Sequence, residues 1–240
     1  DLETSEIIYS TINEGAGAAK ISREAAEPII QAAVAEIGNY ITDPNYVFGV
    51  DCGYPDGFTS RSATAERIAA YPKAKCVTAT IGGATVKGHP KFIETLKKII
   101  ASSNGQSWNG DRNGIKINSN SVSRGIEDQI FLRMNNCGAR SVAAVYAARR
   151  CNPPTARPGS SRHQMGLAID FSGRIAASSP DSNVLPGVLS EAAKWLASNA
   201  RVGVVDTNIT NTSGGNAVGN GTFDIQRLSS ESWHWSVDGG

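Results

Sequence analysis

Four cysteines are the strongest constraint on how this chain of 240 residues can fold. They are Cys52, Cys76, Cys137 and Cys151, and no two of them form a Cys-x-x-Cys pair, which argues against a thiolate zinc knuckle or a thioredoxin-like redox site. Their even number allows three disulfide pairings. We favour Cys52–Cys76 with Cys137–Cys151, because each bond then closes a short loop within one region of the chain. The alternative is four buried free thiols in a cytosolic protein.

Hydrophobic periodicity predicts an α+β protein. Apolar residues at steps of three and four indicate helices, with Ser22 as the cap of one and Gly138 as the stop of another. The expected helices cover 7–12, 22–37, 64–70, 90–101, 123–136 and 185–199. Short, mostly apolar runs indicate strands at 77–86, 141–148, 166–171, 202–205, 222–228 and 233–237.

A polar segment rich in glycine and asparagine, residues 102–120, is the best candidate for a domain boundary. Residues 1–120 are expected to form a mainly helical N-terminal region. Its role is open between an anchoring module for a cell wall or virion and extra packing for the rest of the chain. Residues 121–240 are expected to form an α+β domain with a small antiparallel sheet flanked by helices.

The composition limits the partners that the chain can have. Charged residues make up 19% of it, against roughly 25% in an average globular protein, and 23 basic against 22 acidic residues leave a net charge of +1. Because nucleic-acid-binding proteins normally carry a basic excess, we expect no nucleic-acid partner. No apolar run approaches the roughly 18 residues of a transmembrane helix, and any signal peptide was removed or never existed. The Gly, Ser, Asn and Thr content suits a secreted or cell-envelope protein.

Two of the three histidines lie among residues that suit metal chemistry. His163 precedes Asp170 by seven residues, and a tight turn at Gly166 would bring both side chains to one point, while Glu231 and His234 lie close together downstream. Two imidazoles and a carboxylate suit a zinc ion, and a second carboxylate can take a proton from the water at its fourth position. The alternative is a hydrogen-bonded structural pair. The third histidine, His89, is expected at the surface, where a helix begins.

The residue types around these histidines and carboxylates are more specific than their spacing alone. The pattern S-x-H-x-x-G-x-A-x-D at 161–170, followed by E-x-W-H at 231–234, resembles the paired signature of zinc D-alanyl-D-alanine carboxypeptidases. That family belongs to the lysostaphin, D-Ala-D-Ala peptidase and hedgehog structural group. Residues 156–171 are most similar to its vancomycin-resistance branch, and residues 193–200 are similar to the helix between the two motifs. The resemblance covers residues 123–240, about half of the chain.

The resemblance implies a zinc peptidase domain that cuts peptidoglycan stem peptides at an amide bond next to a D-amino acid. Carried over position by position, it implies Glu231 as the general base and Ser161 as a residue lining the substrate site, with Trp233 packed beneath the metal. The implied zinc ligands are His163, Asp170 and His234.

The sequence departs from the family at one position. Members usually have a Tyr-Arg-Ser strand end and then a helix before the first histidine motif, whereas here VYAARRC ends at Cys151 and leaves no room for that helix. Arg149 or Arg150 can still supply the cation that holds a substrate carboxylate or carbonyl. Arg157 and Arg162 compete for this role. The Cys137–Cys151 bridge would replace the missing helix by holding the strand.

Several functions stay open at this point. A carboxypeptidase that removes terminal D-Ala and an endopeptidase that serves as a bacteriophage or bacterial lysin would use the same site. A non-enzymatic binding module with a zinc fold is a second class, against which Glu231 argues. A serine hydrolase that uses Ser160 or Ser161 with His163 and Asp170 is a third class, and the absence of a G-x-S-x-G motif weakens it.

Overall fold

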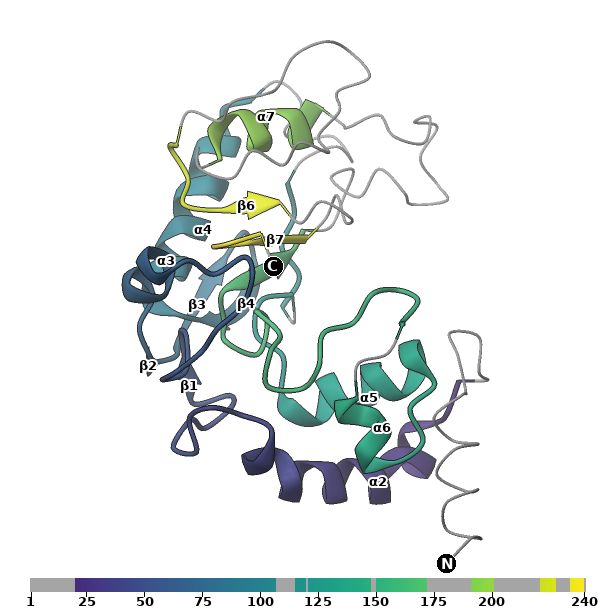
Figure 1. Ribbon diagram of the computed structural model, residues 1–240. Helices are drawn as coiled ribbons and strands as arrows, with labels where there is room; N and C mark the ends of the chain where they lie inside the picture. Colours follow the sequence, from purple (N-terminus) through teal and green to yellow (C-terminus); the bar gives the residue numbers. More distant parts are fainter. Residues whose placement is uncertain are drawn as a thin grey trace, which may run out of the picture.

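The computed structural model describes residues 20–106, 115–119, 121–147, 150–171, 191–200, 221–227 and 234–239. Helices and small antiparallel sheets are mixed across these residues, so the predicted α+β class is confirmed (Figure 1). Among the helices in this part of the chain, none has the length and apolar character needed to cross a membrane.

Three helices gather at one end of the molecule (Figure 1). Ser22 begins the first of them, as predicted, because its hydroxyl accepts a hydrogen bond from the Ala25 N–H at 3.2 Å. Gly138 ends the second in the left-handed conformation, also as predicted. The elements are α2 (Arg23–Glu36) with the short 3₁₀ helix η1 (Ile37–Asn39) after it, α5 (Ile126–Cys137) and α6 (Val142–Tyr146).

The strand predicted over 141–148 is wrong, since residues 142–146 form the helix α6. Ser141 caps the helix by accepting a hydrogen bond from the Ala144 N–H at 3.3 Å. Periodicity cannot distinguish a short buried strand from a short buried helix, and here the serine cap and the alanines favour the helix. The buried Tyr146 hydroxyl donates to the Ala33 carbonyl at 2.6 Å, which ties α6 to α2.

The segment predicted as a strand, 77–86, is confirmed as β structure, but it turns back on itself and forms a hairpin of two strands. β3 (Val77–Ile81) pairs with β4 (Ala84–Gly88) in antiparallel fashion. Gly82 and Gly83 between them both have positive φ, 59° and 83°, as the favoured two-residue hairpin turn requires. The predicted helix after the hairpin is present as α4 (Pro90–Ser103), which packs against both strands.

A three-stranded antiparallel sheet carries the C-terminal motifs. Its strand order is β5-β7-β6, so the middle strand comes last in the sequence. Two more strands pair elsewhere, and two further helices complete the described elements. The sheet consists of β5 (Ala168–Asp170), β7 (His234–Ser236) and β6 (Gln226–Arg227), and the remaining elements are β1 (Asp51–Cys52), β2 (Ala74–Lys75), α3 (Ala65–Ala70) and α7 (Glu191–Asn199).

Two hydrophobic cores hold these elements together, and neither is confined to one side of residue 120. The larger core joins Phe92 and Leu96 of α4 to Leu167 and Trp235 around the three-stranded sheet. The smaller core joins α2 to α5 and α6. The described residues before position 120 therefore pack directly against those that carry the sequence motifs.

Both favoured disulfides, Cys52–Cys76 and Cys137–Cys151, are confirmed, and no cysteine is free. The first closes the loop that holds α3. The second joins the last residue of α5 to the segment that leads toward the histidine motif. The helix predicted over 7–12, the strand predicted over 202–205 and the first part of the helix predicted over 185–199 lie outside the described residues.

Candidate metal centre

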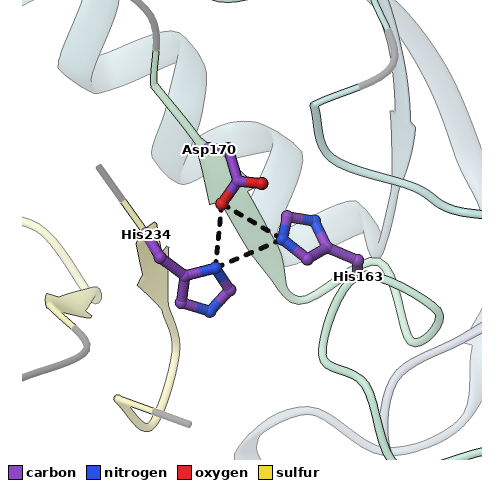
Figure 2. Close-up of side chains that lie close together, drawn as sticks. All are labelled: His163, Asp170 and His234. Carbon is purple, nitrogen blue, oxygen red and sulfur yellow. Dashed lines mark hydrogen bonds and ion pairs between the residues drawn. The ribbon is translucent and has the colours of Figure 1, made fainter. Parts of the chain in front are cut away.

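The structure brings His163, Asp170 and His234 together, and their three side chains point toward one another (Figure 2). His163 Nε2 lies 3.2 Å from Asp170 Oδ1 and 3.2 Å from His234 Nδ1. The third distance, from His234 Nδ1 to Asp170 Oδ1, is 2.9 Å. Both histidines are buried, while the Asp170 side chain is one-third exposed, at 33%.

Strand pairing places two of these side chains. Asp170 and His234 are register partners in the antiparallel pair β5–β7, so their side chains leave the same face of the sheet. His163 comes from the turn that precedes β5, in which the Gly166 N–H donates to the His163 carbonyl at 3.1 Å. The β5–β7 pairing and the turn before β5 therefore bring the three side chains together.

Gly166 is required for this turn. It has φ of +60°, a conformation that favours glycine, and a Cβ at this position would lie 2.6 Å from Cys52 Sγ and 2.8 Å from Gly88 Cα. The turn thus lies tightly against the first disulfide and the end of β4. Residues from before position 120 form the wall that supports the histidine motif.

The donor atoms fit a tetrahedral metal ion. His163 Nδ1 donates to the Val122 carbonyl at 3.1 Å, which leaves the lone pair of Nε2 facing Asp170 and His234. Ligand atoms bound at about 2.0–2.1 Å in a tetrahedron lie about 3.3 Å from one another. The observed separations of 2.9–3.2 Å are close to this spacing. Two imidazoles and one carboxylate are also the ligand types that zinc prefers.

The electrostatics of the cluster favour the forms that bind a cation. Burial raises the pKa of Asp170, but its interactions with the His163 and His234 side chains lower it by more, so the net pKa lies well below its usual range. Burial lowers the pKa of His163, and this outweighs the neighbouring carboxylate, which raises it. An ionised carboxylate and a neutral imidazole are the protonation states that metal coordination needs.

The cluster opens into a cleft of about 660 Å³. Ser161 and the exposed Arg150 line the cleft, and their roles toward a substrate stay predictions. Arg149, Glu231 and Trp233 lie outside the described residues, so their predicted roles stay predictions.

Two cleft residues were not predicted from the sequence, Arg124 and Gln129. Arg124 Nη2 lies 3.7 Å from Asp170 Oδ2, and its Nη1 donates to Gln129 Oε1 at 3.0 Å. Gln129 is fully buried, and its amide also donates to the Ala156 carbonyl at 2.7 Å. The available signal was a glutamine on the apolar face of a predicted helix, with an arginine in the first turn of that predicted helix.

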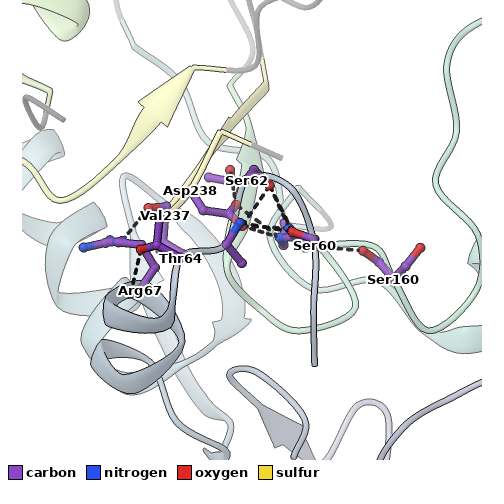
Figure 3. A network of polar contacts seen from close by, with 10 residues as sticks. Ser60, Ser62, Thr64, Arg67, Ser160, Val237 and Asp238 are labelled. Carbon is purple, nitrogen blue, oxygen red and sulfur yellow. Dashed lines mark hydrogen bonds and ion pairs between the residues drawn. The ribbon is translucent and has the colours of Figure 1, made fainter. Parts of the chain in front are cut away.

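Arg162, one of the competing arginines, has a different partner. It is 5% exposed, and its guanidinium binds the Asp238 carboxylate with Nε and Nη2 at 2.9 Å and 2.7 Å from Oδ2. Nη2 also donates to the hydroxyls of Ser60 and Ser62, in the polar network around Asp238 (Figure 3). Nη1 donates to the Ser160 carbonyl at 3.1 Å.

This network stabilises the turn at residues 163–166, called the histidine turn below. Because Arg162 directly precedes His163, its bonds to Asp238 and to the 60–62 loop fix the backbone from which the His163 side chain leaves. An Arg–carboxylate pair this buried is costly to break, since the remaining carboxylate would lose the cation that compensates its buried charge. Arg162 is therefore a positioning residue for the cluster.

The third histidine departs from its prediction. His89 does begin a helix, α4, but it is 5% exposed rather than at the surface. Its Nε2 donates to the Pro72 carbonyl at 3.1 Å, and its Nδ1 accepts from the Lys91 N–H at 3.2 Å. Burial is possible because both ring nitrogens are satisfied.

The serine-hydrolase alternative finds no support at His163. Its Nδ1 is bonded to the Val122 carbonyl, and its Nε2 faces Asp170 and His234. The Ser160 hydroxyl instead donates to the Arg157 carbonyl at 2.8 Å. Within the described residues, no serine forms a nucleophile–base pair with this histidine.

In comparisons with known proteins, the chain matches no family model, no curated protein and no solved structure. The metal site therefore rests on the geometry of the described residues, among which a His-Asp-His group at the edge of a cleft can hold a metal ion.

Proposed function

We propose that this protein is a zinc-dependent peptidase that hydrolyses peptidoglycan stem peptides at an amide bond next to a D-amino acid. The observation that carries the proposal is the His163, Asp170 and His234 cluster, which combines zinc-type ligands, near-tetrahedral spacing and access to a cleft. The choice of substrate rests on the resemblance of the two sequence motifs to zinc D-alanyl-D-alanine carboxypeptidases.

The three ligands leave one tetrahedral position for water and substrate. When bound, zinc lowers the pKa of water toward neutrality and polarises the scissile carbonyl. The Glu231 carboxylate, three residues before the ligand His234, takes the proton from the attacking water and passes it to the nitrogen of the leaving amine.

Arg124 is the best-supported cation for the substrate. Its guanidinium lines the cleft beside Asp170, and Gln129 orients it from α5. A guanidinium can hold a substrate carboxylate or a developing oxyanion through two parallel hydrogen bonds. Arg124 also lies just before α5, and an arginine ahead of a helix is what members of the resembled family usually have before the first histidine motif. Arg150 lines the same cleft and stays a second candidate.

A carboxypeptidase and an endopeptidase both fit this mechanism, and the two confirmed disulfides are compatible with action outside the cytoplasm. The decisive experiment incubates the protein with purified peptidoglycan, with and without a chelator, and analyses the products by mass spectrometry. Free alanine alone identifies a carboxypeptidase, whereas released stem peptides or dimers identify an endopeptidase. Products that form equally well after metal removal, or no products at all, would overturn the proposal.

The Glu231→Ala variant distinguishes an enzyme from a binding module with a zinc fold. We expect this variant to keep its zinc, because Glu231 is not one of the three ligands, and to lose hydrolysis. Zinc content is measured by elemental analysis beside the product assay. A protein that binds peptidoglycan and zinc but releases nothing, with or without this change, would be a binding module.

A further inference from the structure

A second, smaller pocket of about 220 Å³ adjoins the metal cleft. Ser160 lines both cavities, so the two are neighbours on the protein surface. The segment 157–160 forms one wall of the pocket, and residues 40–42, just after η1, form another. Neither the mechanism nor the ligand cluster uses this pocket.

The pocket has a rigid aromatic side. The Tyr40 ring stacks on the Tyr146 ring with centroids 3.8 Å apart and planes inclined by 3°. Tyr146 is 4% exposed and anchored by its hydrogen bond to the Ala33 carbonyl, whereas Tyr40 stays 47% exposed. A large aromatic ring that is held in place and still faces solvent is typical of a binding surface.

The opposite wall is also fixed. The Ser160 N–H and hydroxyl both reach the Arg157 carbonyl, at 3.0 Å and 2.8 Å, and the Gly159 N–H donates to Gln164 Oε1 at 2.8 Å. Gly159 has φ of +83°, and a Cβ there would lie 2.6 Å from the Ile41 side chain. The two walls are thus in close contact, and the pocket exists before any ligand arrives.

The lining indicates the kind of ligand. Beside the tyrosine pair it offers the hydroxyls of Thr42, Thr59 and Ser160 and the exposed Arg157, and none of the described lining residues carries a carboxylate. An aromatic face with several hydroxyls and one guanidinium matches a neutral ring that has an apolar C–H face and polar groups at its edge. A pyranose sugar with an N-acetyl group has this chemistry.

We propose that this pocket binds an N-acetylated sugar of the glycan strand while the attached stem peptide lies in the metal cleft. The inference rests on the proposed function, and it deepens that function by naming the substrate as glycan-linked peptide rather than free peptide. Tyr40 supplies the stacking surface, and the hydroxyls and Arg157 bind the edge of the sugar.

A binding experiment tests the pocket without any hydrolysis. Chitotetraose, a soluble oligomer of N-acetylglucosamine, is titrated into the full-length protein by calorimetry or NMR. We expect the Tyr40→Ala variant to bind about tenfold more weakly, as loss of an aromatic stacking partner predicts. Val77→Ala is the matched control, because Val77 is also an exposed apolar residue, at 38%, but lies on β3 and not in the pocket.

A kinetic comparison tests the link to the cleft. Tyr40→Ala is expected to raise KM about tenfold for a stem peptide that carries its sugar and to leave KM unchanged for the sugar-free peptide. Should Tyr40→Ala fail to fold, the exposed Arg157→Ala variant replaces it, with the same direction expected in both assays.

The outcomes separate this inference from the proposed function. Hydrolysis of stem peptides together with chitotetraose binding that is absent or independent of Tyr40 would overturn the sugar pocket and leave the peptidase standing. Binding of chitotetraose that depends on Tyr40, without any hydrolysis, would support the pocket and overturn the peptidase. A KM that rises equally for both peptides would also overturn the inference, because the change would then not involve the sugar.

Discussion

Asp170 and His234 face each other across the β5–β7 pair, with His234 Nδ1 2.9 Å from Asp170 Oδ1, although 64 positions separate them in the sequence. A sheet of three short strands thus holds two of the three candidate ligands. His163 completes the cluster from the turn before β5. This arrangement makes the metal centre testable one side chain at a time.

We expect His163→Ala and His234→Ala to lose bound zinc, because two remaining ligands seldom retain the metal against a chelator. Metal content is measured by elemental analysis after dialysis. The matched control is His89→Asn, which removes the remaining histidine and keeps a helix-capping side chain. Loss of zinc in the control, or its retention in both ligand variants, would contradict the assignment.

Arg124→Ala is expected to lower kcat/KM by about 100-fold, the usual effect of removing one donor that stabilises developing charge. Zinc content should stay unchanged, because Arg124 is not a ligand. Arg124→Lys should recover little activity, since a lysine cannot form two parallel hydrogen bonds. Steady-state kinetics beside Arg150→Ala show which of the two cleft arginines acts on the substrate.

Arg162→Ala is expected to destabilise the fold by about 3–5 kcal/mol, the usual cost of leaving one partner of a buried ion pair alone. Its partner Asp238 is 2% exposed and would lose its charge partner. Chemical denaturation measures the change in the free energy of unfolding. The control is Lys97→Ala, which breaks an exposed pair with Glu94 and should change stability by about 0.5 kcal/mol or less. Equal effects in the two variants would refute the positioning role.

Gly166→Ala is expected to weaken zinc binding, because the added Cβ would press on Cys52 Sγ and Gly88 Cα and move the His163 turn. The substitution also places alanine at a positive φ, which costs about 1 kcal/mol or more. Gly38→Ala is the control, since a Cβ there meets nothing within 4 Å. Competition with a chromogenic chelator reports the zinc affinity. Equal affinity in the two variants would show that the turn does not depend on this glycine.

Stability is expected to fall in acid partly through Asp224. Burial raises the pKa of its carboxyl, but hydrogen bonds from Tyr71 and Arg67 lower it by more, so the folded pKa lies below the unfolded value. The ionised form therefore stabilises the fold at neutral pH, and this contribution is lost as pH falls below about 4. Denaturation curves between neutral and acid pH should be less pH-dependent for Asp224→Asn. An unchanged pH dependence would exclude this carboxyl as a cause.

The sequence predicted the elements whose local signals agree with one another. Ser22 and Gly138 mark real helix ends, because capping depends on the residue itself more than on tertiary context. Residues 77–86 were predicted as one strand, although Gly82 and Gly83, between two alternating apolar and polar runs, are the signal of a hairpin turn. Residues 141–148 were wrong because a short apolar segment fits either a strand or a helix.

The sequence predicted the three candidate ligands of the site but not Arg124, and the difference has a physical reason. His163, Asp170 and His234 belong to short motifs, and the structure brings them together. Arg124 belongs to no motif that spacing alone singles out, and it reaches Asp170 only because α5 places the preceding residues beside the histidine turn. Long-range packing of this kind leaves no trace in residue spacing.

The Cys52–Cys76 disulfide closes residues 52–76 into a covalent ring, and the first residues of this ring contact the histidine turn. The Gly53 N–H donates to the Met165 carbonyl at 2.8 Å, and Cys52 Sγ lies only 2.6 Å from where a Cβ of residue 166 would stand. A shortened chain that began near residue 121 would keep all three candidate metal ligands but lose the contacts of the ring with the histidine turn. A minimal version of the protein should therefore include the ring of residues 52–76 as well as the two sequence motifs.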